Sequence, residues 1–485
     1  MPNAIAYLAL LLWPAMCLLL FRKLPVERAI LWSLLAGYLL LPPLAEFDLP
    51  LVPDMNKYTI PSLAAFLACV LVARKPVPVW PSHPAIKVLI VLFVAGVIPT
   101  VLTNRDPVLF LGLGQSESMR VITGAKPGLR WIDIASVVSN QLIVLLPFFL
   151  ARRYLSTDAG LRAILVALAA SALAYSLPAL LEIMIGPKVN IWVYGFFQHS
   201  LSQMIRNGGY RPIVFLPHGL WLAFFTMTAV LAAAALAKAA KGPDRIRFAM
   251  ATVYLFAVLV LCKSLASLLY GLAFTPLVAL TPMRLQLRAA LLLAVVAFCF
   301  PALRNLGLIP TEALVSLAEQ ISPDRARSLA YRFENEQLLL ERAAERPWLG
   351  WGGWGRWLVW DHDSGERISV PDGYWIITFG TYGWLGYVAE MGLLTAPLAL
   401  LAAQARKQPG GAVSRFAAPV ALILAATMVD MLINATLIPF TWMCAGAVLG
   451  HAERLKYGSL SRPKPTLFGG TQALDGQTRR AGPLM

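Results

Sequence analysis

Basic residues with no acidic neighbours mark one stretch of this chain as a candidate site. Residues 187–217 contain no acidic residue, yet Arg211 lies there in a "GGYRP" turn and His218 follows directly. A guanidinium pairs bidentately with phosphate oxygens, so a stiff turn holding one predicts a fixed anionic ligand. Two roles suit Arg206 equally well: binding the same anionic ligand, or extending its side chain toward the lipid headgroups.

A second group of charged residues lies on a predicted helix between 304 and 373. Ser322 is placed as its N-cap, Pro323 as its first residue, and Pro347 stops it. Leu329, Phe333, Leu340 and Ala344 form an apolar stripe on the helical wheel. Arg325, Arg332 and Glu336 fall together at one edge of that stripe. Glu336, one turn beyond Arg332, is expected to hold its guanidinium in place. An ordinary solvated face is the alternative for the remaining arginines, Arg327, Arg342 and Arg346.

The segment that follows this helix is rich in glycine and tryptophan. In "PWLGWGGWGRWLVW", Trp351 and Trp354 offer flat faces to sugars or to the lipid headgroup layer. His362 comes next, between two aspartates. Asp372 stands at the start of an apolar segment whose Gly380, Gly383 and Gly386 allow close helix packing. Asp372 and His362 are therefore further candidate site residues.

The elements that must position these residues are predicted to be membrane helices. Of the 485 residues, 58% are hydrophobic and 14% charged, and the mean hydropathy is +0.67. About 20 apolar residues cross a bilayer as a helix, and such runs recur about 13 times, with 12 to 14 as the range. The runs lack the alternation of outer-membrane strands. The expected fold class is an all-α polytopic membrane protein with a large periplasmic loop that contains an amphipathic helix.

Lysine and arginine clusters alternate along the chain and predict its orientation. We expect residues 1–303 to form a transmembrane bundle with two arginine-bearing periplasmic loops, 104–130 and 187–217. Residues 304–373 form the large periplasmic loop, 374–452 the C-terminal transmembrane helices, and 453–485 a disordered cytoplasmic tail. The formal net charge of +16 follows from this topology and calls for no nucleic-acid partner.

Three segments resemble the O-antigen ligase and polysaccharide polymerase superfamily of bacterial envelope proteins. They are "RPIVFLPHGLWLAFF", "YRFENEQLLLERAAERPWLGWG" and "DGYWIITFGTYGWLG". The resemblance covers most of the chain from about 131 to 450, with the helix-to-turn block from Arg332 to Gly352 as its most specific part. It implies a bacterial inner-membrane protein whose site faces the periplasm, acting on a bilayer-embedded lipid-linked substrate. Further implied partners are a chain-length regulator or other envelope-glycan assembly proteins.

The resemblance also implies a reaction. It implies an inverting, metal-independent glycosyltransferase without a cofactor, whose donor is a glycan on undecaprenyl diphosphate. Arg211 and Arg332 would hold the diphosphate, and Asp372 would accept the proton of the acceptor hydroxyl. Ligases of this family usually have histidine where this chain has Asp372. A polymerase of O-antigen, capsule or exopolysaccharide units is therefore expected first, and a ligase transferring glycan to lipid A core is an alternative.

Two other functions remain open from the residues alone. Glu46 and Asp48, or the Asp361-His362-Asp363 run, could hold a metal in a polyprenyl-phosphate-sugar glycosyltransferase. A flippase for lipid-linked glycans would need polar residues deep in the membrane. The candidates for that role are Lys263, Glu182, Glu390 and Asp430.

Overall fold

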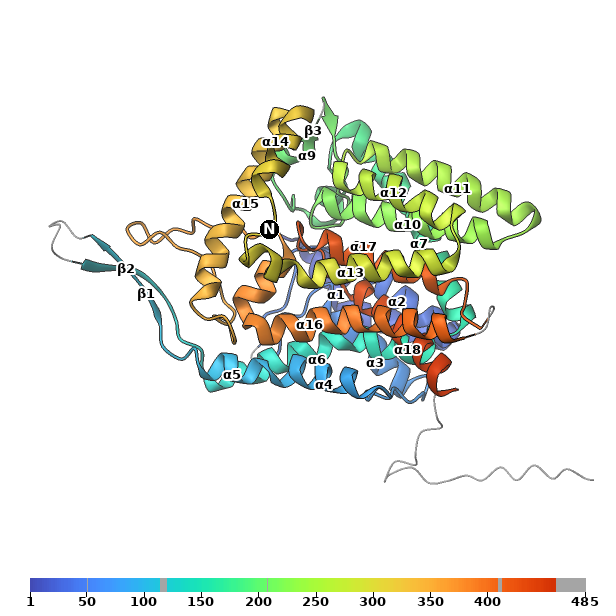
Figure 1. Ribbon diagram of the computed structural model, residues 1–485, viewed down its shortest axis with the longest axis horizontal. Helices are drawn as coiled ribbons and strands as arrows, with labels where there is room; N and C mark the ends of the chain where they lie inside the picture. The colour runs from blue at the N-terminus through green and yellow to red at the C-terminus, as the bar shows by residue number, and fades with distance from the viewer. Residues whose placement is uncertain (50, 114–119, 207, 409–411, 459–485) are drawn as a thin grey trace, which may run out of the picture.

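The computed structural model describes residues 1–49, 51–113, 120–206, 208–408 and 412–458, which are mostly helical (Figure 1). Fourteen helices coincide with the predicted apolar segments. They are α1 (Ala4–Lys23), α2 (Val26–Leu40), α3 (Thr59–Leu71), α4 (Pro84–Ala95), α5 (Val97–Leu102), α6 (Trp131–Tyr154), α7 (Asp158–Ile185), α10 (Gly219–Ala239), α11 (Gly242–Leu261), α12 (Leu265–Leu280), α13 (Met283–Asn305), α16 (Tyr374–Lys407), α17 (Ala417–Asp430) and α18 (Pro439–Tyr457).

Connecting segments hold the remaining elements among the described residues. They are β1 (Val108–Leu113), β2 (Arg120–Lys126), α8 (Val189–Tyr194), α9 (Leu201–Met204), β3 (Ile205–Arg206), β4 (Gly209–Tyr210), α14 (Thr311–Ile321) and α15 (Pro323–Ala344). The strands β1 and β2 form one antiparallel hairpin and β3 and β4 form a second, shorter one.

Among the described residues, seven helical segments are long and apolar enough to cross a membrane. They are α1, α4 together with α5, α6, α7, α10, α13 and α16, and three shorter apolar helices, α3, α12 and α17, accompany them. The chain therefore has the composition and helix lengths of a multi-pass membrane protein. The larger number of about 13 crossings stays a prediction.

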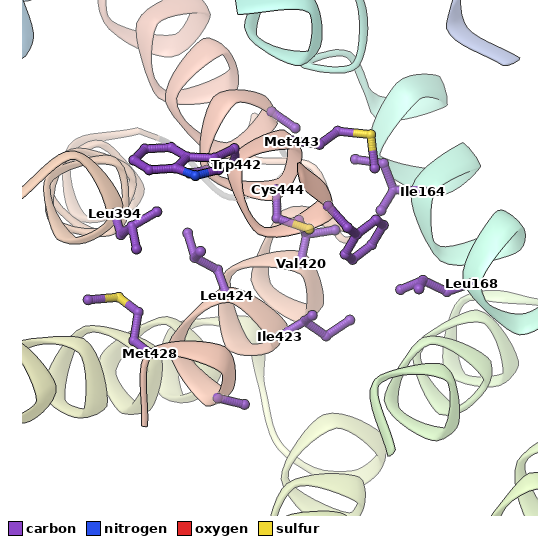
Figure 2. Close-up of a cluster of buried hydrophobic side chains, with 14 of the residues drawn as sticks. Ile164, Leu168, Leu394, Val420, Ile423, Leu424, Met428, Trp442, Met443 and Cys444 are labelled. Atoms are coloured by element: carbon purple, nitrogen blue, oxygen red, sulfur yellow. The ribbon is translucent and has the colours of Figure 1, made fainter. Parts of the chain in front are cut away.

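The core lies around α10, α17 and α18. Figure 2 shows Leu424 and Met428 of α17 beside Trp442 of α18, with Leu394 of α16 on one side and Leu168 of α7 on the other. Small residues let the helices approach closely. A Cβ atom added at Gly446 would lie 2.1 Å from the carbonyl oxygen of Phe148, so α18 and α6 pack with their backbones nearly touching.

Predicted loops of the same orientation gather at the same end of the bundle. At the left of Figure 1, α15 and the β1–β2 hairpin extend beyond the ends of α16 and α6, and α14 lies at the top of the view. At the opposite end, Arg152 of α6 and Glu453 of α18 form a buried ion pair with an Nε–Oε2 distance of 2.7 Å. The orientation that the alternating loop charges predict stays a prediction.

A break in α16 fixes the glycine- and tryptophan-rich segment. Gly383 has a φ of 62°, so the helix is interrupted there, and its neighbours lack their normal intrahelical partners. The backbone N–H of Trp384 donates to the carbonyl of Pro347 at 2.7 Å, and the N–H of Trp351 donates to the carbonyl of Gly380 at 2.9 Å. A Cβ at Gly383 would meet the Trp348 carbonyl carbon at 2.4 Å. The glycines thus allow a loop to dock on the interior of a helix.

Three expectations need correction. The 104–130 segment, predicted as a loop, contains the β1–β2 hairpin, and α14 was not predicted. The buried face of α15 is rotated from the predicted stripe, because Leu339 and Ala343 are buried whereas Ala344 is exposed. Helix α18 continues to Tyr457, beyond the predicted boundary at 452, and the expected disordered tail from 459 onward lies outside the described residues.

Candidate functional site

Arg332 and Asp372 form an ion pair at the end of the bundle that carries α15. The distance from Arg332 Nε to Asp372 Oδ2 is 3.5 Å, and the side chains are 26% and 34% exposed. Arg332 Nη1 also donates to the carbonyl of Ile433, in the link between α17 and α18, at 3.0 Å. The guanidinium is therefore held on two sides and still reachable by a ligand. Burial raises the pKa of Asp372 above its ordinary value, and Arg332 opposes that change.

Glu336 lies one turn beyond Arg332, as the sequence predicts, but it has other partners. The indole of Trp375 donates to Glu336 Oε1 at 3.1 Å, and Arg304 Nε lies 3.7 Å from Oε2. Neither Glu336 Oε2 nor Arg304 Nε has a hydrogen-bond partner. Burial raises the pKa of Glu336 to about 7, against the lowering effects of Trp375 and Arg304. Glu336 thus joins α15 to α13 and α16 and does not directly clamp Arg332.

Arg211 is the most deeply buried of the predicted site arginines, with 7% of its surface exposed. Its Nη2 donates to the carbonyl of Lys263 at 2.8 Å, between α11 and α12, whereas its Nε has no partner. A Cβ at Gly219, the first residue of α10, would lie 2.4 Å from Arg211 Cδ. Gly219 therefore makes room for the arginine stem beside the N-terminus of α10.

Two histidines stand at the same helix end. The rings of His199 and His218 are nearly perpendicular, with centroids 4.4 Å apart. His218 is the N-cap of α10, and its Nδ1 accepts a hydrogen bond from the Leu220 backbone N–H at 2.9 Å. Burial first, then His199, Arg211, Arg332 and Arg206, lower the pKa of His218 to about 3. His218 is therefore neutral at physiological pH.

Arg211 and Arg332 belong to one electrostatic environment. Burial first, and then the charges of Arg206 and Arg332, lower the pKa of Arg211 to about 10, while Cys262 opposes this change. Both guanidiniums also act on His218. Loop 187–217 and helix α15, far apart in the sequence, thus both supply positive charges that act on His218 at the N-terminus of α10, where a helix favours anions.

Four predicted site residues lie elsewhere or have different roles. Arg325 is on the exposed side of α15. Trp351 is buried, with the guanidinium of Arg342 3.4 Å and that of Arg346 4.4 Å from its ring centroid, so it packs inside the loop. Its predicted role as a sugar platform is wrong, because its ring is covered.

Trp354 and His362 remain at the surface, apart from the arginines. Trp354 is 55% exposed with a φ of 55°, in the glycine-rich turn. His362 lies beside the β1–β2 hairpin: its carbonyl accepts from the Thr123 hydroxyl, and its ring is 6.0 Å from that of Phe110. In the described parts of the chain His362 makes no contact with Asp372 and does not replace it at the site.

Sequence reasoning missed Arg356 and Arg304. Arg356 is 1% exposed, and its guanidinium donates to the carbonyls of Trp351, Pro127 and Asp106 at 3.1, 2.6 and 2.9 Å. It binds the 104–130 segment to the glycine-rich turn. An arginine enclosed by glycines and tryptophans was the available signal for a buried role. Arg304 lies at the end of an apolar helix, and the sequence around it gave no such signal.

Comparison with known proteins adds no family. No family model matches the chain, and no curated protein matches it. The function of this site must therefore be argued from its own chemistry.

Asp361 and the four polar candidates for transport are engaged in hydrogen bonds within the fold. Among the described residues no group of three or more His, Cys, Asp or Glu side chains is arranged to hold a metal. Asp361 Oδ1 instead accepts from the backbone N–H of Asp363 and of Ser364 within a turn. Each polar candidate for transport also has hydrogen-bond partners nearby. Glu182 accepts hydrogen bonds from three backbone N–H groups, and Glu390 accepts them from two hydroxyls. Asp430 accepts hydrogen bonds from the side chains of Asn434 and Thr436, and Lys263 donates one to the Arg206 carbonyl.

Proposed function

We propose that this protein is a membrane glycosyltransferase that polymerises oligosaccharide repeat units carried on undecaprenyl diphosphate. The observation that carries the proposal is the shared environment of Arg211 and Arg332 beside Asp372. Two permanently charged guanidiniums, a carboxylate and a helix N-terminus form a site suited to a phosphorylated ligand and a hydroxyl. In this proposal the chain crosses the bacterial inner membrane about 13 times and the site faces the periplasm.

The proposed reaction is a single displacement at the anomeric carbon. The acceptor hydroxyl oxygen forms the new bond to that carbon, the bond from the carbon to the phosphate oxygen breaks, and its electron pair goes to that oxygen. Arg211 and Arg332 neutralise the charge that develops there. Asp372 accepts the hydroxyl proton or orients the hydroxyl, and the raised pKa of this carboxyl favours proton acceptance. One displacement inverts the anomeric configuration.

Transfer of purified lipid-linked repeat units tests the proposal. The full chain in lipid vesicles is given repeat units on undecaprenyl diphosphate, and the products are separated by size. A ladder of longer chains on the same lipid supports polymerisation. Glycan that is transferred only to added lipid A core indicates a ligase, and units that cross the bilayer without forming a bond indicate a flippase. Either of these results, or no reaction with any acceptor, would refute the polymerase proposal.

A further inference from the structure

Hydrogen bonds fix both imidazole rings at the N-terminus of α10. The Nδ1 of His218 accepts from the Leu220 N–H at 2.9 Å, and the Nδ1 of His199 accepts from the Ser200 N–H at 2.7 Å. A neutral imidazole carries one proton, and the nitrogen that accepts a hydrogen bond does not bear it. Each ring therefore carries its proton on Nε2 and presents an Nε2–H donor.

Those two donors are weakly used within the fold. His218 Nε2 lies 3.4 Å from Gln203 Oε1, which is long for a hydrogen bond. His199 Nε2 has no hydrogen-bond partner in the described part of the chain. Both N–H groups are thus available to an acceptor that enters the site.

The surroundings keep the ring of His218 neutral. Burial also lowers the pKa of His199, against the raising effect of a hydrogen bond with the Ser200 backbone. The groups acting on His218 are His199, Arg206 and Arg211 from the loop and Arg332 from α15, and no carboxylate is among them. A proton on Nδ1 would also face the N–H of Leu220 and the positive end of the helix dipole. The pKa of His218 is about 3, and a nearby opposite charge changes a pKa by about 1 to 3. An anion therefore leaves His218 neutral at pH 7.

Arg211 gives independent evidence of a ligand at this place. Its side chain is more than nine-tenths buried, and its Nε–H has no acceptor among the residues that the structure describes. A buried donor without an acceptor is costly. The stem of Arg211 lies against Gly219, so the vacant donor is beside the first turn of α10, where phosphate oxygens bind favourably.

We propose that His199 and His218 are neutral hydrogen-bond donors to the oxygens of the phosphorylated ligand, and that neither ring takes up a proton when it binds. This inference rests on the proposed function and specifies how its diphosphate is held. Neutral donors satisfy phosphate oxygens without adding to the charge of the three arginines. After transfer, this site therefore binds the remaining lipid diphosphate less tightly than a site with two imidazolium ions would.

Two substitutions of His218 separate its two roles. His218→Asn keeps a side-chain oxygen that can cap the Leu220 N–H but removes the donor at the Nε2 position. His218→Gln carries an amide N–H near the Nε2 position but caps the helix poorly. With the full chain in lipid nanodiscs and farnesyl diphosphate as the probe, we expect His218→Asn to weaken binding about 10-fold or more. His218→Gln should bind within about 3-fold of the wild type despite a lower melting temperature.

The outcomes of the binding experiment separate a failure of this inference from a failure of the proposed function. If His218→Asn binds farnesyl diphosphate as the wild type does while Arg332→Lys loses binding, the donor role is overturned and the phosphate site stands. If the wild type binds no farnesyl diphosphate, both are overturned. Nitrogen-15 NMR of labelled histidines gives a readout that does not depend on activity. Both rings should show the neutral Nε2–H form from pH 6 to 8 with and without the probe, and an imidazolium or Nδ1–H signal contradicts the inference.

Discussion

Asp372 Oδ2 lies 3.5 Å from Arg332 Nε, across the gap between helix α15 and the start of α16. Both side chains are about one-quarter to one-third exposed, so the pair borders solvent and can exchange partners. A phosphate that approaches Arg332 would compete with Asp372 for it and leave the carboxylate to act on a hydroxyl. In the proposed reaction, the pair therefore couples binding of the phosphate to exposure of the carboxylate.

Replacing Arg332 by lysine should greatly reduce transfer although the positive charge remains. A lysine ammonium cannot make the planar, two-pronged contact of a guanidinium with phosphate or bridge to the Ile433 carbonyl. We expect a rate reduction on the order of 100-fold, measured as repeat units joined per minute in vesicles. Arg325→Lys, on the exposed side of the same helix, is the control and should keep wild-type activity. Wild-type turnover in Arg332→Lys would contradict the diphosphate role.

Gly219→Ala should damage the site through Arg211. The new methyl group would lie 2.4 Å from Arg211 Cδ and 3.0 Å from the Pro212 carbonyl oxygen, so the arginine stem must move. A displacement of about 1 Å at a catalytic group can cost about 100-fold in rate. Activity and melting temperature are compared with those of Gly353→Ala, whose added methyl group meets nothing within 4 Å. Equal activity of the two variants would show that the position of Arg211 does not matter.

Glu336→Gln should alter how stability depends on pH. The pKa of Glu336 is about 7 in the folded protein and about 4.5 in the unfolded chain, so the folded state binds the proton more tightly. Its contribution is complete below pH 4.5 and is lost as the pH rises through 7. From pH 5 to pH 8 the wild type should lose on the order of 1 to 3 kcal/mol relative to the variant. Thermal unfolding at both pH values measures this, and a pH-independent difference would refute it.

Gly383→Ala should destabilise the protein more than it alters the arginine site. The added methyl group would meet the Trp348 carbonyl carbon at 2.4 Å, and the residue would have to keep a φ of 62°. Strain of this kind costs on the order of 1 to 3 kcal/mol before the clash is counted. The melting temperature of the purified protein should fall, and protease should cleave the 345–370 segment faster. An unchanged melting temperature would mean that the break in α16 relaxes without loss.

The helices could be predicted because their signal is local. Every apolar segment that was interpreted as a span is helical, and α15 ends three residues before Pro347, as expected from the effect of proline on helices. The conformation of 104–130 could not be predicted in this way. Its described strands pair with each other, and Arg356 binds the chain on either side of them through the carbonyls of Asp106 and Pro127, which lie more than 200 residues away in the sequence.

The charged residues of the candidate site could be predicted from the sequence, but their contacts could not. The absence of acids around Arg211 and the spacing of Arg332 and Glu336 identified residues whose charges do act on one another. The wheel placed Glu336 beside Arg332, yet Trp375 and Arg304 take its oxygens, because a helical wheel does not show what packs against it. Trp351 was misjudged for the same reason. Arg342 of α15 and Arg346 just after that helix cover the ring, so it is not available to a sugar.

The docking of Pro347–Gly352 on the break in α16 has a consequence for biosynthesis. This segment leaves the ribosome before the helix whose backbone groups it must bind, so it stays unpaired until α16 is inserted in the bilayer. Insertion in turn exposes the unpaired carbonyl of Gly380 and the unpaired N–H of Trp384 to hydrocarbon, unless the 347–352 segment forms hydrogen bonds with them. The 347–352 segment and helix α16 therefore each need the other to reach the folded state. A chain truncated between them should be recognised by quality-control proteases as incomplete.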